Sequence, residues 1–342
     1  MDSQLPSTMR ACQWTTNTTG IENTLHLNPS ATLPKNANNL PAGHTLVKVA
    51  YTTLNPFDYK VAEAPVLGNY ILPKPSIPCL DFSGTVVATK NAELSVGDLV
   101  FGRTNPPFFG CLAEYVVVDS AGISKVPKGV SLQDAATAGI AALAAYQSVA
   151  PFVKEGSQVF INGGSGGTGT FGIQFAKALG CTVTTTCSTR NIELCKSLGA
   201  DEVIDYTALK EDLPTALKAR GKPFDLIVDN VFADPNLYWH SPSYLIPNGT
   251  FSTPGDTKPS SLVNIAMASF LPAWAGGGQR PFVFVRNQPK KADFEAIGKW
   301  MAQGKVKAVV EEVIEMADAG KGFGRLKGGR VRGKIVVRVG GD

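Results

Sequence analysis

The chain has 342 residues, of which 44% are hydrophobic and 18% charged, and its formal net charge is +4 at pH 7. This length exceeds the usual size of a single hydrophobic core, so we expect two domains. Basic residues are scattered except in residues 321–338, where glycine and valine interleave with them. That pattern excludes a nucleic-acid-binding footprint and fits a loop followed by a closing strand.

Cysteine usage and apolar runs indicate the compartment. Six cysteines form no C-x-x-C pair, which favours reduced thiols in a cytosolic setting. Residues 1–8 lack the basic segment and apolar core of a secretory signal. The longest apolar run, residues 135–146, is too short to span a bilayer. We therefore expect a soluble, cytoplasmic protein with neither a nucleic-acid partner nor a membrane partner.

Residues 9–125 are typical of short strands. Residues 45–51, 84–89 and 113–118 alternate polar and apolar side chains, and turn signals at 41–43, 97–98 and 106–107 separate them. This pattern predicts a small β-rich domain, a partly open barrel. The irregular segments 55–79 and 102–110 are long for plain connections, so we expect them to carry function.

The periodicity changes after Pro127. A helical run over 135–149 precedes an apolar run over 158–162, a glycine-rich turn, a second helical pattern that ends at Gly180, and a β-rich run over 181–187. Gly164, Gly166 and Gly169 fit G-x-G-x-x-G, in which small residues let the backbone approach a pyrophosphate at a helix N-terminus. The turn, which also contains Ser165, Gly167 and Thr168, predicts a dinucleotide site; a plain glycine-rich turn is the alternative.

The second strand of this unit indicates which dinucleotide binds. In NAD-binding proteins it ends in Asp or Glu, which accepts the ribose 2′-hydroxyl. Here Ser188, Thr189 and Arg190 follow the strand, and two hydroxyls with a guanidinium suit a 2′-phosphate. We therefore predict NADPH as the cofactor. The alternative is that Ser188 or Thr189 only caps the next helix while Arg190 is solvated.

The remaining chain alternates helical and strand-like segments up to about residue 268 and then departs from that pattern. Strands at 202–204, 224–229 and 249–252 alternate with helices at 192–198, 213–220 and 237–245. This predicts an α/β fold with a doubly wound parallel Rossmann sheet over 127–268. We expect residues 269–342, with a strand-like segment at 281–285, a helix at 291–303 and a terminal strand at 333–339, to return to the β-rich domain of residues 1–126.

Several strings, in their order and spacing, resemble one family over nearly the whole chain. They are Asn-Pro-Phe-Asp-Tyr-Lys at 55–60, Ile-Pro-Cys-Leu-Asp-Phe-Ser-Gly at 77–84, Val-Gly-Asp-Leu-Val-Phe-Gly at 96–102, Leu-Ala-Glu-Tyr at 112–115, the turn at 163–169, and the pairs at 205–206 and 333–334. The family is the medium-chain dehydrogenases/reductases, in the zinc-free quinone oxidoreductase and enoyl reductase branch. The resemblance implies a GroES-like barrel and NADPH-dependent reduction of quinones or α,β-unsaturated carbonyls.

The resemblance also implies that no metal is bound. Zinc-dependent alcohol dehydrogenases of this superfamily have a Cys in the first loop and a His-Glu pair before a later glycine, where this chain has Asn55 to Asp58 and Leu80-Asp81. The three histidines lie far apart, and zinc needs about three or four convergent ligands. We predict no metal site.

The loop at 55–60 supplies the catalytic candidates. Hydride addition to an enone develops an enolate that hydrogen bonds stabilise, and a proton must then be delivered. Asn55 is predicted to donate to the carbonyl or to orient the nicotinamide ribose, and Tyr59 and Lys60 to donate a proton or to position the substrate. The alternatives are a turn-forming Asn55, a packed Tyr59 and a solvated Lys60.

Further cofactor contacts are carried over from the resemblance. They are Gly166, Gly167, Thr168, Ser188, Arg190, Tyr206 and Asn230, of which Asn230 is alternatively a turn residue. Two positions depart from the family. Ala144 replaces a frequent Thr, and Cys79 replaces a frequent Gly, either as a packed small residue or as a thiol near the pocket.

Three functions are consistent with these features. The first is a reductase of enones or quinones, and the second is a stand-alone enoyl reductase or tailoring enzyme that acts on a carrier-bound polyketide chain. The third is a non-catalytic, NADPH-binding regulatory protein. We expect a homodimer rather than a monomer, because residues 281–285 offer an apolar strand edge.

Overall fold

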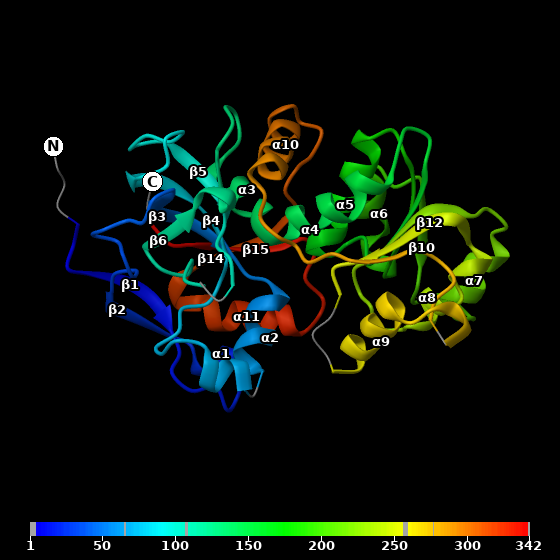
Figure 1. The fold of residues 1–342 in the computed structure, drawn as a ribbon, viewed down its shortest axis with the longest axis horizontal. Coiled ribbons are helices and arrows are strands. Elements are labelled where there is room, and N and C mark those ends of the chain that lie inside the picture. Colours follow the sequence, from blue (N-terminus) through cyan, green and yellow to red (C-terminus); the bar gives the residue numbers. More distant parts are fainter. Residues whose placement is uncertain (1–4, 65, 107–108, 256–258, 276, 341–342) are drawn as a thin grey trace. The chain divides into compact units, whose positions relative to one another are not determined.

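The computed structural model describes residues 5–64, 66–106, 109–255, 259–275 and 277–340. Part of the turn expected at 106–107 therefore lies outside the described residues. The chain forms two compact units (Figure 1). The first consists of Met1–Leu143, Gln288–Gly304 and Ala308–Asp342, and the second of Ala144–Asn287 and Lys305–Lys307.

The first unit is built on a seven-stranded sheet. Its strand order is β14-β15-β3-β4-β5-β7, with β6 paired to β3, and every pair is antiparallel except β14 with β15. A separate antiparallel pair is formed by β1 and β2. The strands are β1 (Thr8–Gln13), β2 (His26–Thr32), β3 (His44–Thr53), β4 (Asp81–Thr89), β5 (Leu99–Arg103), β6 (Tyr115–Asp119), β7 (Ile123–Lys125), β14 (Val310–Glu315) and β15 (Lys334–Arg338).

Short helices surround this sheet. They are α1 (Ile21–Thr24), α2 (Pro56–Glu63), a π-helical turn (Leu67–Ile71), 3-10 turns (Ser120–Gly122, Met316–Asp318), α3 (Leu132–Ala136), a π-helical segment (Ala138–Ala142), α10 (Lys291–Ala302) and α11 (Ala319–Lys327). Two of them correct our expectations. Residues 55–60 open a helix rather than a loop, and residues 321–338 begin within α11 rather than in a loop. The expected terminal strand is present as β15.

The second unit contains a six-stranded parallel sheet with the order β10-β9-β8-β11-β12-β13. The chain runs outward from β8 in one direction and from β11 in the other, so the order reverses between these two strands. This is the doubly wound Rossmann arrangement, whose ligands bind at the carboxyl ends of the strands beside the reversal. The strands are β8 (Gln158–Asn162), β9 (Thr182–Cys187), β10 (Glu202–Asp205), β11 (Phe224–Asp229), β12 (Leu245–Thr253) and β13 (Phe282–Phe284).

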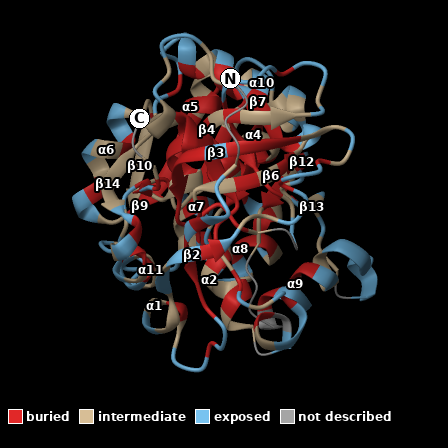
Figure 2. Ribbon diagram, turned by 90° about the vertical axis from the view of Figure 1, so that its left-hand side faces the viewer, coloured by how far each residue is buried: buried red, intermediate tan, exposed pale blue. Residues whose placement is uncertain are grey.

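The helices of the second unit connect these strands. They are α4 (Leu143–Val149), α5 (Gly167–Ala178), α6 (Ile192–Ser197), α7 (Leu213–Ala219), α8 (Asn236–Trp239), α9 (Pro259–Phe270) and 3-10 turns (Ala150–Phe152, Thr189–Asn191, Ser241–Ser243, Ala273–Ala275). The helix expected at 237–245 is shorter than predicted, because Pro242 stands in a 3-10 turn and Leu245 already starts β12. The central strands β8, β9 and β11 are largely buried, whereas the edge strand β10 is only partly buried (Figure 2).

The unit boundaries differ from the predicted ranges 1–126, 127–268 and 269–342. Helix α3 packs on β3, β4 and β5, so the first unit extends beyond residue 126. Strand β13 pairs with β12, so residues 282–284 complete the parallel sheet instead of returning to the first unit. Helix α10 and strands β14 and β15 belong to the first unit. The α/β fold with a β-rich partner is therefore as predicted, with the return point after residue 287.

Candidate functional site

Helix α2 starts with its own N-terminal cap. The backbone N–H of Asn55 donates to Asp58 Oδ2 at 2.8 Å, and the N–H of Asp58 donates to the Asn55 carbonyl at 3.1 Å. Pro56 occupies the first helical turn, where its fixed φ and missing N–H cost nothing. The string at 55–58 is therefore a helix start, and Asp58 is held in place by the cap that it forms.

Asn55 is tied into the interior of the first unit. Its Nδ2 donates to Asp81 Oδ2 at 2.8 Å and to the Thr53 carbonyl at 3.3 Å, while its Oδ1 accepts from Lys334 Nζ. The residue is only 2% exposed. Because both sides of its amide are engaged, the arrangement favours a positioning role for Asn55 over direct donation to a substrate carbonyl.

Lys334 and Asp81 form a buried ion pair beside this cap. Lys334 Nζ lies 3.7 Å from Asp81 Oδ2 and donates to the Leu54 carbonyl at 3.1 Å. Burial lowers the pKa of Lys334, and the charge of Asp81 opposes that shift. Sequence reasoning noticed both residues within motifs but gave Lys334 no role, because its partners lie about 280 positions earlier in the chain.

Asp58 is a buried carboxyl with one oxygen unused. Its Oδ1 has no hydrogen-bond partner among the described residues, and the residue is 2% exposed. Burial, followed by the charge of Asp81, raises the pKa of Asp58 to about 8. The group is therefore mainly a neutral acid at pH 7, with a proton to donate.

Tyr59 and Lys60 follow Asp58 on α2, and both are partly buried. Tyr59 packs against the core of the first unit, and Lys327 Nζ lies 5.8 Å from the centre of its ring. Lys327 is itself paired with Glu22 and Glu63. Successive helical residues point about 100° apart, so Asp58, Tyr59 and Lys60 serve different sides of α2.

The glycine turn of the second unit leaves room for an anion. A Cβ at Gly164 would lie 2.1 Å from Thr185 Oγ1, and one at Gly169 would lie 2.1 Å from the Gly163 carbonyl oxygen. Gly166 is the N-cap of α5, and its built Cβ meets only the Gly163 carbonyl oxygen, at 3.6 Å. The first N–H groups of a helix have no intrahelical acceptor. The turn therefore fits a pyrophosphate, which Ser165, Gly167 and Thr168 would help to hold.

Thr186 and Asn162 fix this turn from the neighbouring strands. Gly164 N–H donates to the Thr186 carbonyl at 2.8 Å, and Gly163 N–H donates to Thr186 Oγ1 at 2.9 Å. Thr186 Oγ1 donates in turn to Asn162 Oδ1 at 2.6 Å. Thr186 in β9 and Asn162 at the end of β8 thus hold the backbone of the glycine turn at the point where the strand order reverses.

Asn191, which sequence reasoning did not select, links the glycine turn to the end of β9. Its Nδ2 donates to Ser165 Oγ at 3.0 Å and to Ser188 Oγ at 3.3 Å. Its Oδ1 is buried without a partner among the described residues. The only sequence signal was its place directly after Arg190.

A carboxylate lies beside the residues predicted to hold a 2′-phosphate. Thr189 Oγ1 donates to Asp205 Oδ2 at 2.5 Å, and Thr207 Oγ1 donates to Asp205 Oδ1 at 2.6 Å. These hydrogen bonds lower the pKa of Asp205. Arg190 is exposed on the 3-10 turn that follows β9, and Tyr206 is 57% exposed. Thr189 therefore donates to the Asp205 carboxylate, which the predicted 2′-phosphate site did not include.

Asn230 follows β11 at the carboxyl end of the sheet. Its Nδ2 donates to the Asn162 carbonyl at 3.2 Å, and its Oδ1 is buried without a partner among the described residues. The buried Asp229 shapes this turn by accepting from Val231 N–H and Phe232 N–H, both at 3.0 Å. Asn230 therefore offers an unused acceptor where the Rossmann arrangement binds its ligand.

The remaining sequence candidates are structural. Cys79 is fully buried at φ 69°, and burial raises its pKa, so it is a packed thiol. Ala144 is 2% exposed. Within the described part of the chain, no group of three or more His, Cys, Asp or Glu residues is arranged to hold a metal ion. None of the described helices combines the length and apolar character needed to cross a bilayer.

Comparison with protein families matches two regions of the chain. Residues 41–128 match the alcohol dehydrogenase GroES-like domain, and residues 198–337 match the family described as zinc-binding dehydrogenase. The first region contains helix α2 and the buried Asp81. The second contains strands β10 to β13 of the parallel sheet and most of β15.

Individual relatives extend the match to the whole chain. The trans-enoyl reductase pgmF of Aspergillus terreus is 44% identical, with 99% of this chain and 98% of the relative covered. A chloroplastic quinone-oxidoreductase homolog of Spinacia oleracea is 30% identical over 85% and 88% of the two chains. The quinone oxidoreductase structure from Coxiella burnetii superposes with a TM-score of 0.81 at 27% identity, covering 97% and 99%. The chain therefore belongs to the medium-chain dehydrogenase/reductase superfamily of oxidoreductases, in the branch that contains enoyl reductases and quinone oxidoreductases.

Proposed function

We propose that this protein is an NADPH-dependent reductase of α,β-unsaturated carbonyl compounds, with quinones as the second substrate class. The observation that carries the proposal is the 44% identity to a trans-enoyl reductase over the whole chain. The glycine turn supports it by fitting a pyrophosphate, and helix α2 supports it by carrying Tyr59 and Lys60, two side chains that are able to donate a proton. In this proposal the second unit binds the dinucleotide and the first unit binds the substrate.

The reaction requires a hydride and a proton. NADPH, when bound, supplies the hydride to the β-carbon of the substrate, whose π electrons move onto the carbonyl as an enolate. The protein must then stabilise the enolate oxygen and deliver a proton to the α-carbon. We assign these two tasks to Tyr59 and Lys60, and Asn55 holds the start of their helix through Asp81 and Lys334.

A substrate panel tests the proposal. NADPH oxidation is measured with enones, quinones and enoyl thioesters, and we expect turnover on enones or enoyl thioesters with formation of the saturated product. Turnover restricted to enoyl thioesters would support the biosynthetic alternative, in which a carrier-bound polyketide chain is the substrate. Tight NADPH binding without turnover on any compound would contradict the reductase assignment and support a regulatory protein.

Two conservative variants test the residues of α2. Lys60→Met and Tyr59→Phe each remove a donor while retaining most of the packed side chain. We expect kcat to fall by about 10²-fold or more for the residue that delivers the proton, in line with the usual contribution of general acid catalysis. Unchanged turnover in either variant would remove that residue from the mechanism.

Cofactor preference is tested by binding rather than by turnover. We propose that Arg190, with Ser188 and Tyr206, recognises the 2′-phosphate, while the carboxylate of Asp205 opposes it. NADPH affinity should therefore fall in Arg190→Ala and rise in Asp205→Asn, with NADH affinity nearly unchanged in Arg190→Ala. If Arg190→Ala bound NADPH as tightly as the wild type, the role assigned to Arg190 would be wrong.

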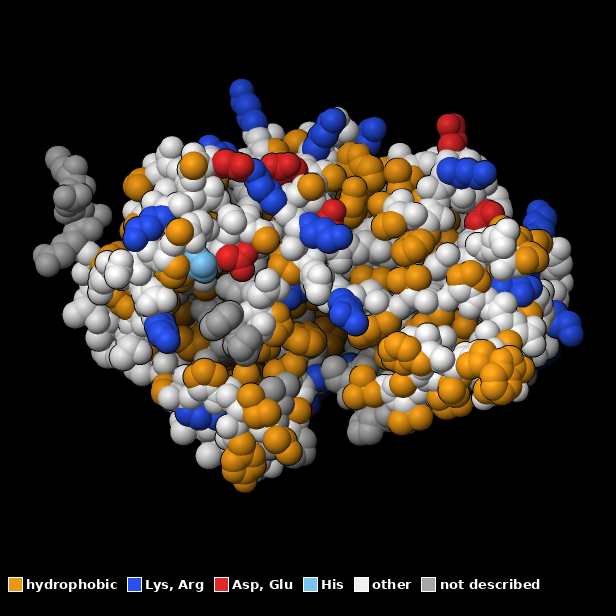
Figure 3. Space-filling model, viewed as in Figure 1, with side chains coloured by type: hydrophobic (Ala, Val, Ile, Leu, Met, Phe, Trp, Pro, Cys, Tyr) orange, Lys and Arg blue, Asp and Glu red, His pale blue; other side chains and the backbone are white. Residues whose placement is uncertain are grey.

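We further propose that the protein forms a homodimer through β13 and acts in the cytoplasm. β13 is the last strand of the parallel sheet, and Phe284 on it is 38% exposed. Figure 3 shows hydrophobic side chains gathered around α9, which packs on β13. Sedimentation should give a dimer that Phe284→Lys converts to a monomer, and Leu99→Lys serves as the control. A fluorescent fusion imaged in cells tests the location.

A further inference from the structure

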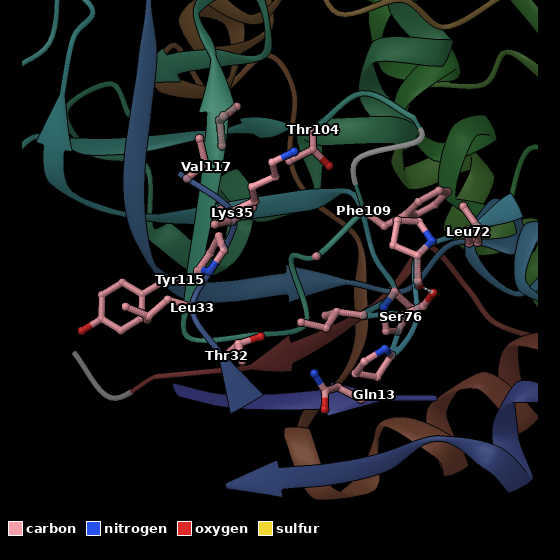
Figure 4. A pocket seen from close by; sticks show the side chains of 18 of the residues that line it. Gln13, Thr32, Leu33, Lys35, Leu72, Ser76, Thr104, Phe109, Tyr115 and Val117 are labelled. Atoms are coloured by element: carbon pink, nitrogen blue, oxygen red, sulfur yellow. Dashed lines mark hydrogen bonds between the residues drawn. The ribbon is translucent and has the colours of Figure 1, made fainter. Parts of the chain in front are cut away.

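Helix α2 has one side on a groove and another side on neighbouring helices. The groove has a volume of about 510 Å³, all of its lining residues belong to the first unit, and Figure 4 shows Phe109 in its wall. Helix α2 contributes Asp58, Val61 and Ala62 to this wall, whereas Tyr59 is not among the described lining residues. Tyr59, which we assign to catalysis, therefore belongs to a different side of α2.

Tyr59 shares its side of α2 with Glu63, because residues four apart in a helix lie on the same face. Helices α1 and α11 both contact α2, and Figure 1 shows the three helices together. Tyr59 is partly buried and packs on the core of the first unit, as do Leu25 after α1 and Leu326 in α11. Lys327 of α11 reaches this side of α2, with its Nζ 5.8 Å from the centre of the Tyr59 ring. Tyr59 therefore lies where the three helices meet.

Lys327 ties the three helices together through two carboxylates. Its Nζ lies 2.7 Å from Glu22 Oε2 in α1 and 2.9 Å from Glu63 Oε1 at the end of α2. Glu63 Oε1 also accepts a hydrogen bond from the Ile21 N–H of α1 at 3.0 Å. The three charged side chains are only 25–28% exposed, so water screens them less than it screens an ordinary surface pair.

Removal of the Lys327 ammonium would act on Tyr59 in two ways. Glu22 and Glu63 now contact the same nitrogen atom, so without it their negative charges would repel each other and separate α1 from the end of α2. The ammonium also lies within about 6 Å of the ring centre, the distance within which a cation attracts an aromatic face. Both effects bear on the orientation of the Tyr59 ring.

We propose that Lys327 is a positioning residue for the reduction: it holds the Tyr59 ring so that the hydroxyl keeps the orientation needed to donate to the enolate oxygen or the α-carbon. This inference rests on the proposed function, which assigns Tyr59 and Lys60 to those tasks. Lys327 acts through Tyr59 and Glu63 and has no assigned contact with the substrate. Its loss should therefore lower kcat more than it changes KM.

Substitutions of Lys327 test this role with the enone or enoyl thioester that gives the highest turnover. We expect kcat to fall at least about fivefold in Lys327→Met, in line with the usual strength of a partly desolvated cation–π contact, with KM nearly unchanged. Lys327→Arg should keep kcat within about twofold, because a guanidinium also pairs with carboxylates and stacks on aromatic rings. Lys321→Met removes an exposed lysine of the same helix and serves as the control. A wild-type kcat in Lys327→Met would overturn the proposal.

A double-mutant cycle separates the positioning of Tyr59 from a general stabilisation of the fold. Once Tyr59→Phe has removed the hydroxyl, adding Lys327→Met should lower kcat no further. An equal fold loss of kcat in the wild-type and Tyr59→Phe backgrounds would show that Lys327 does not act through Tyr59, and it would overturn this proposal while the catalytic role of Tyr59 stands. A wild-type kcat in Tyr59→Phe itself would refute both roles.

Fluorine NMR of the protein labelled with 3-fluorotyrosine reports on the Tyr59 ring without any turnover. The Tyr59 resonance, assigned by its absence in Tyr59→Phe, should move in Lys327→Met and stay in place in Lys321→Met. An unmoved resonance in Lys327→Met would overturn the proposal, even if the protein reduced none of the compounds in the substrate panel. A moved resonance without any turnover would refute the proposed function while the contact between Lys327 and Tyr59 stands.

Thermal unfolding checks that each variant is folded. If Lys327→Met does not fold, Glu22→Gln and Glu63→Gln are added to it, because they remove the uncompensated charges while an amide at position 63 can still accept from the Ile21 N–H. The same comparisons of kcat and of the Tyr59 resonance then apply to the triple variant. Wild-type values of both in that variant would overturn the proposal.

Discussion

At the scale of single residues, the start of α2 shows how motif residues acquire different roles. Asn55 has the residue type expected of a catalytic donor, yet its amide is engaged by Asp81, Thr53 and Lys334. Asp58 was not among the catalytic candidates, yet it holds an unused oxygen and a raised pKa. The sequence pointed to this segment, but the contacts of each side chain depend on partners that are distant in the chain.

The raised pKa of Asp58 predicts a specific pH dependence of stability. Between about pH 4 and pH 8 the folded protein keeps a proton on Asp58 that the unfolded chain has released. This contribution to the free energy of unfolding is complete below about pH 4 and is lost as the pH rises towards 8. Urea unfolding of the wild type should therefore show a decline, on the order of 1 kcal/mol per pH unit, that Asp58→Asn lacks. Parallel pH profiles for the two proteins would contradict the shift.

The buried Lys334 predicts a large stability effect from one substitution. Lys334→Met leaves Asp81 as an uncompensated buried charge, so we expect the free energy of unfolding to fall by about 3–5 kcal/mol. Denaturant titration measures this change. Lys321→Met removes an exposed lysine that pairs with Asp318, and it should leave stability nearly unchanged. A similar small effect in both variants would show that Lys334 is not needed to balance Asp81.

At the scale of elements, sequence patterns predicted the second unit better than the first. The strand, glycine turn and helix at 158–178 are all present, because their signals are local: an apolar run, small residues at fixed spacing and a helical period. Helix α2 was predicted as a loop because Asn55-Pro56 is also a turn signal. The capping residue three positions later, Asp58, was the signal that favoured a helix.

Two substitutions of glycine by alanine, at Gly164 in the glycine turn and at Gly172 in α5, should have opposite effects on stability. Gly164→Ala forces a Cβ against Thr185 Oγ1, so it should weaken dinucleotide binding at least tenfold and lower stability by about 1–3 kcal/mol. Gly172→Ala lies within α5, where the new Cβ makes only ordinary contact with Ile161, at 3.4 Å. This substitution should raise the free energy of unfolding by up to about 1 kcal/mol, because alanine has a higher helix propensity than glycine. Calorimetry measures dinucleotide binding and thermal unfolding measures stability for both variants. Dinucleotide binding with wild-type affinity by Gly164→Ala would contradict a pyrophosphate site at this turn.

At the scale of the whole molecule, the sequence predicted the two architectures but not where the chain passes between them. Helix α3 and strand β13 each fell on the wrong side of a predicted boundary. Both are short segments whose assignment depends on which sheet they contact, and that information is tertiary. The groove was not predictable for the same reason, since its walls come from segments between residues 9 and 119.

The division into two units predicts separable unfolding. In Lys334→Met, which weakens the first unit, calorimetry should show two transitions. If the second unit binds NADPH as we propose, the cofactor at 100 times its Kd should stabilise that unit alone, by about 2.7 kcal/mol. The upper transition should therefore move while the lower one stays in place. A single transition that shifts as a whole would show that the units unfold together.

The position of β15 has a consequence for synthesis on the ribosome. β15 consists of Lys334–Arg338, close to the end of the chain, and it lies between β14 and β3. All strands of the second unit have been made by residue 284, so that unit can fold while translation continues. The part of β3 that β15 pairs with stays open until residues 334–338 have been made and have left the exit tunnel. The sheet of the first unit is therefore completed only after every strand of the second unit has been made, and until then part of β3 is an open strand edge.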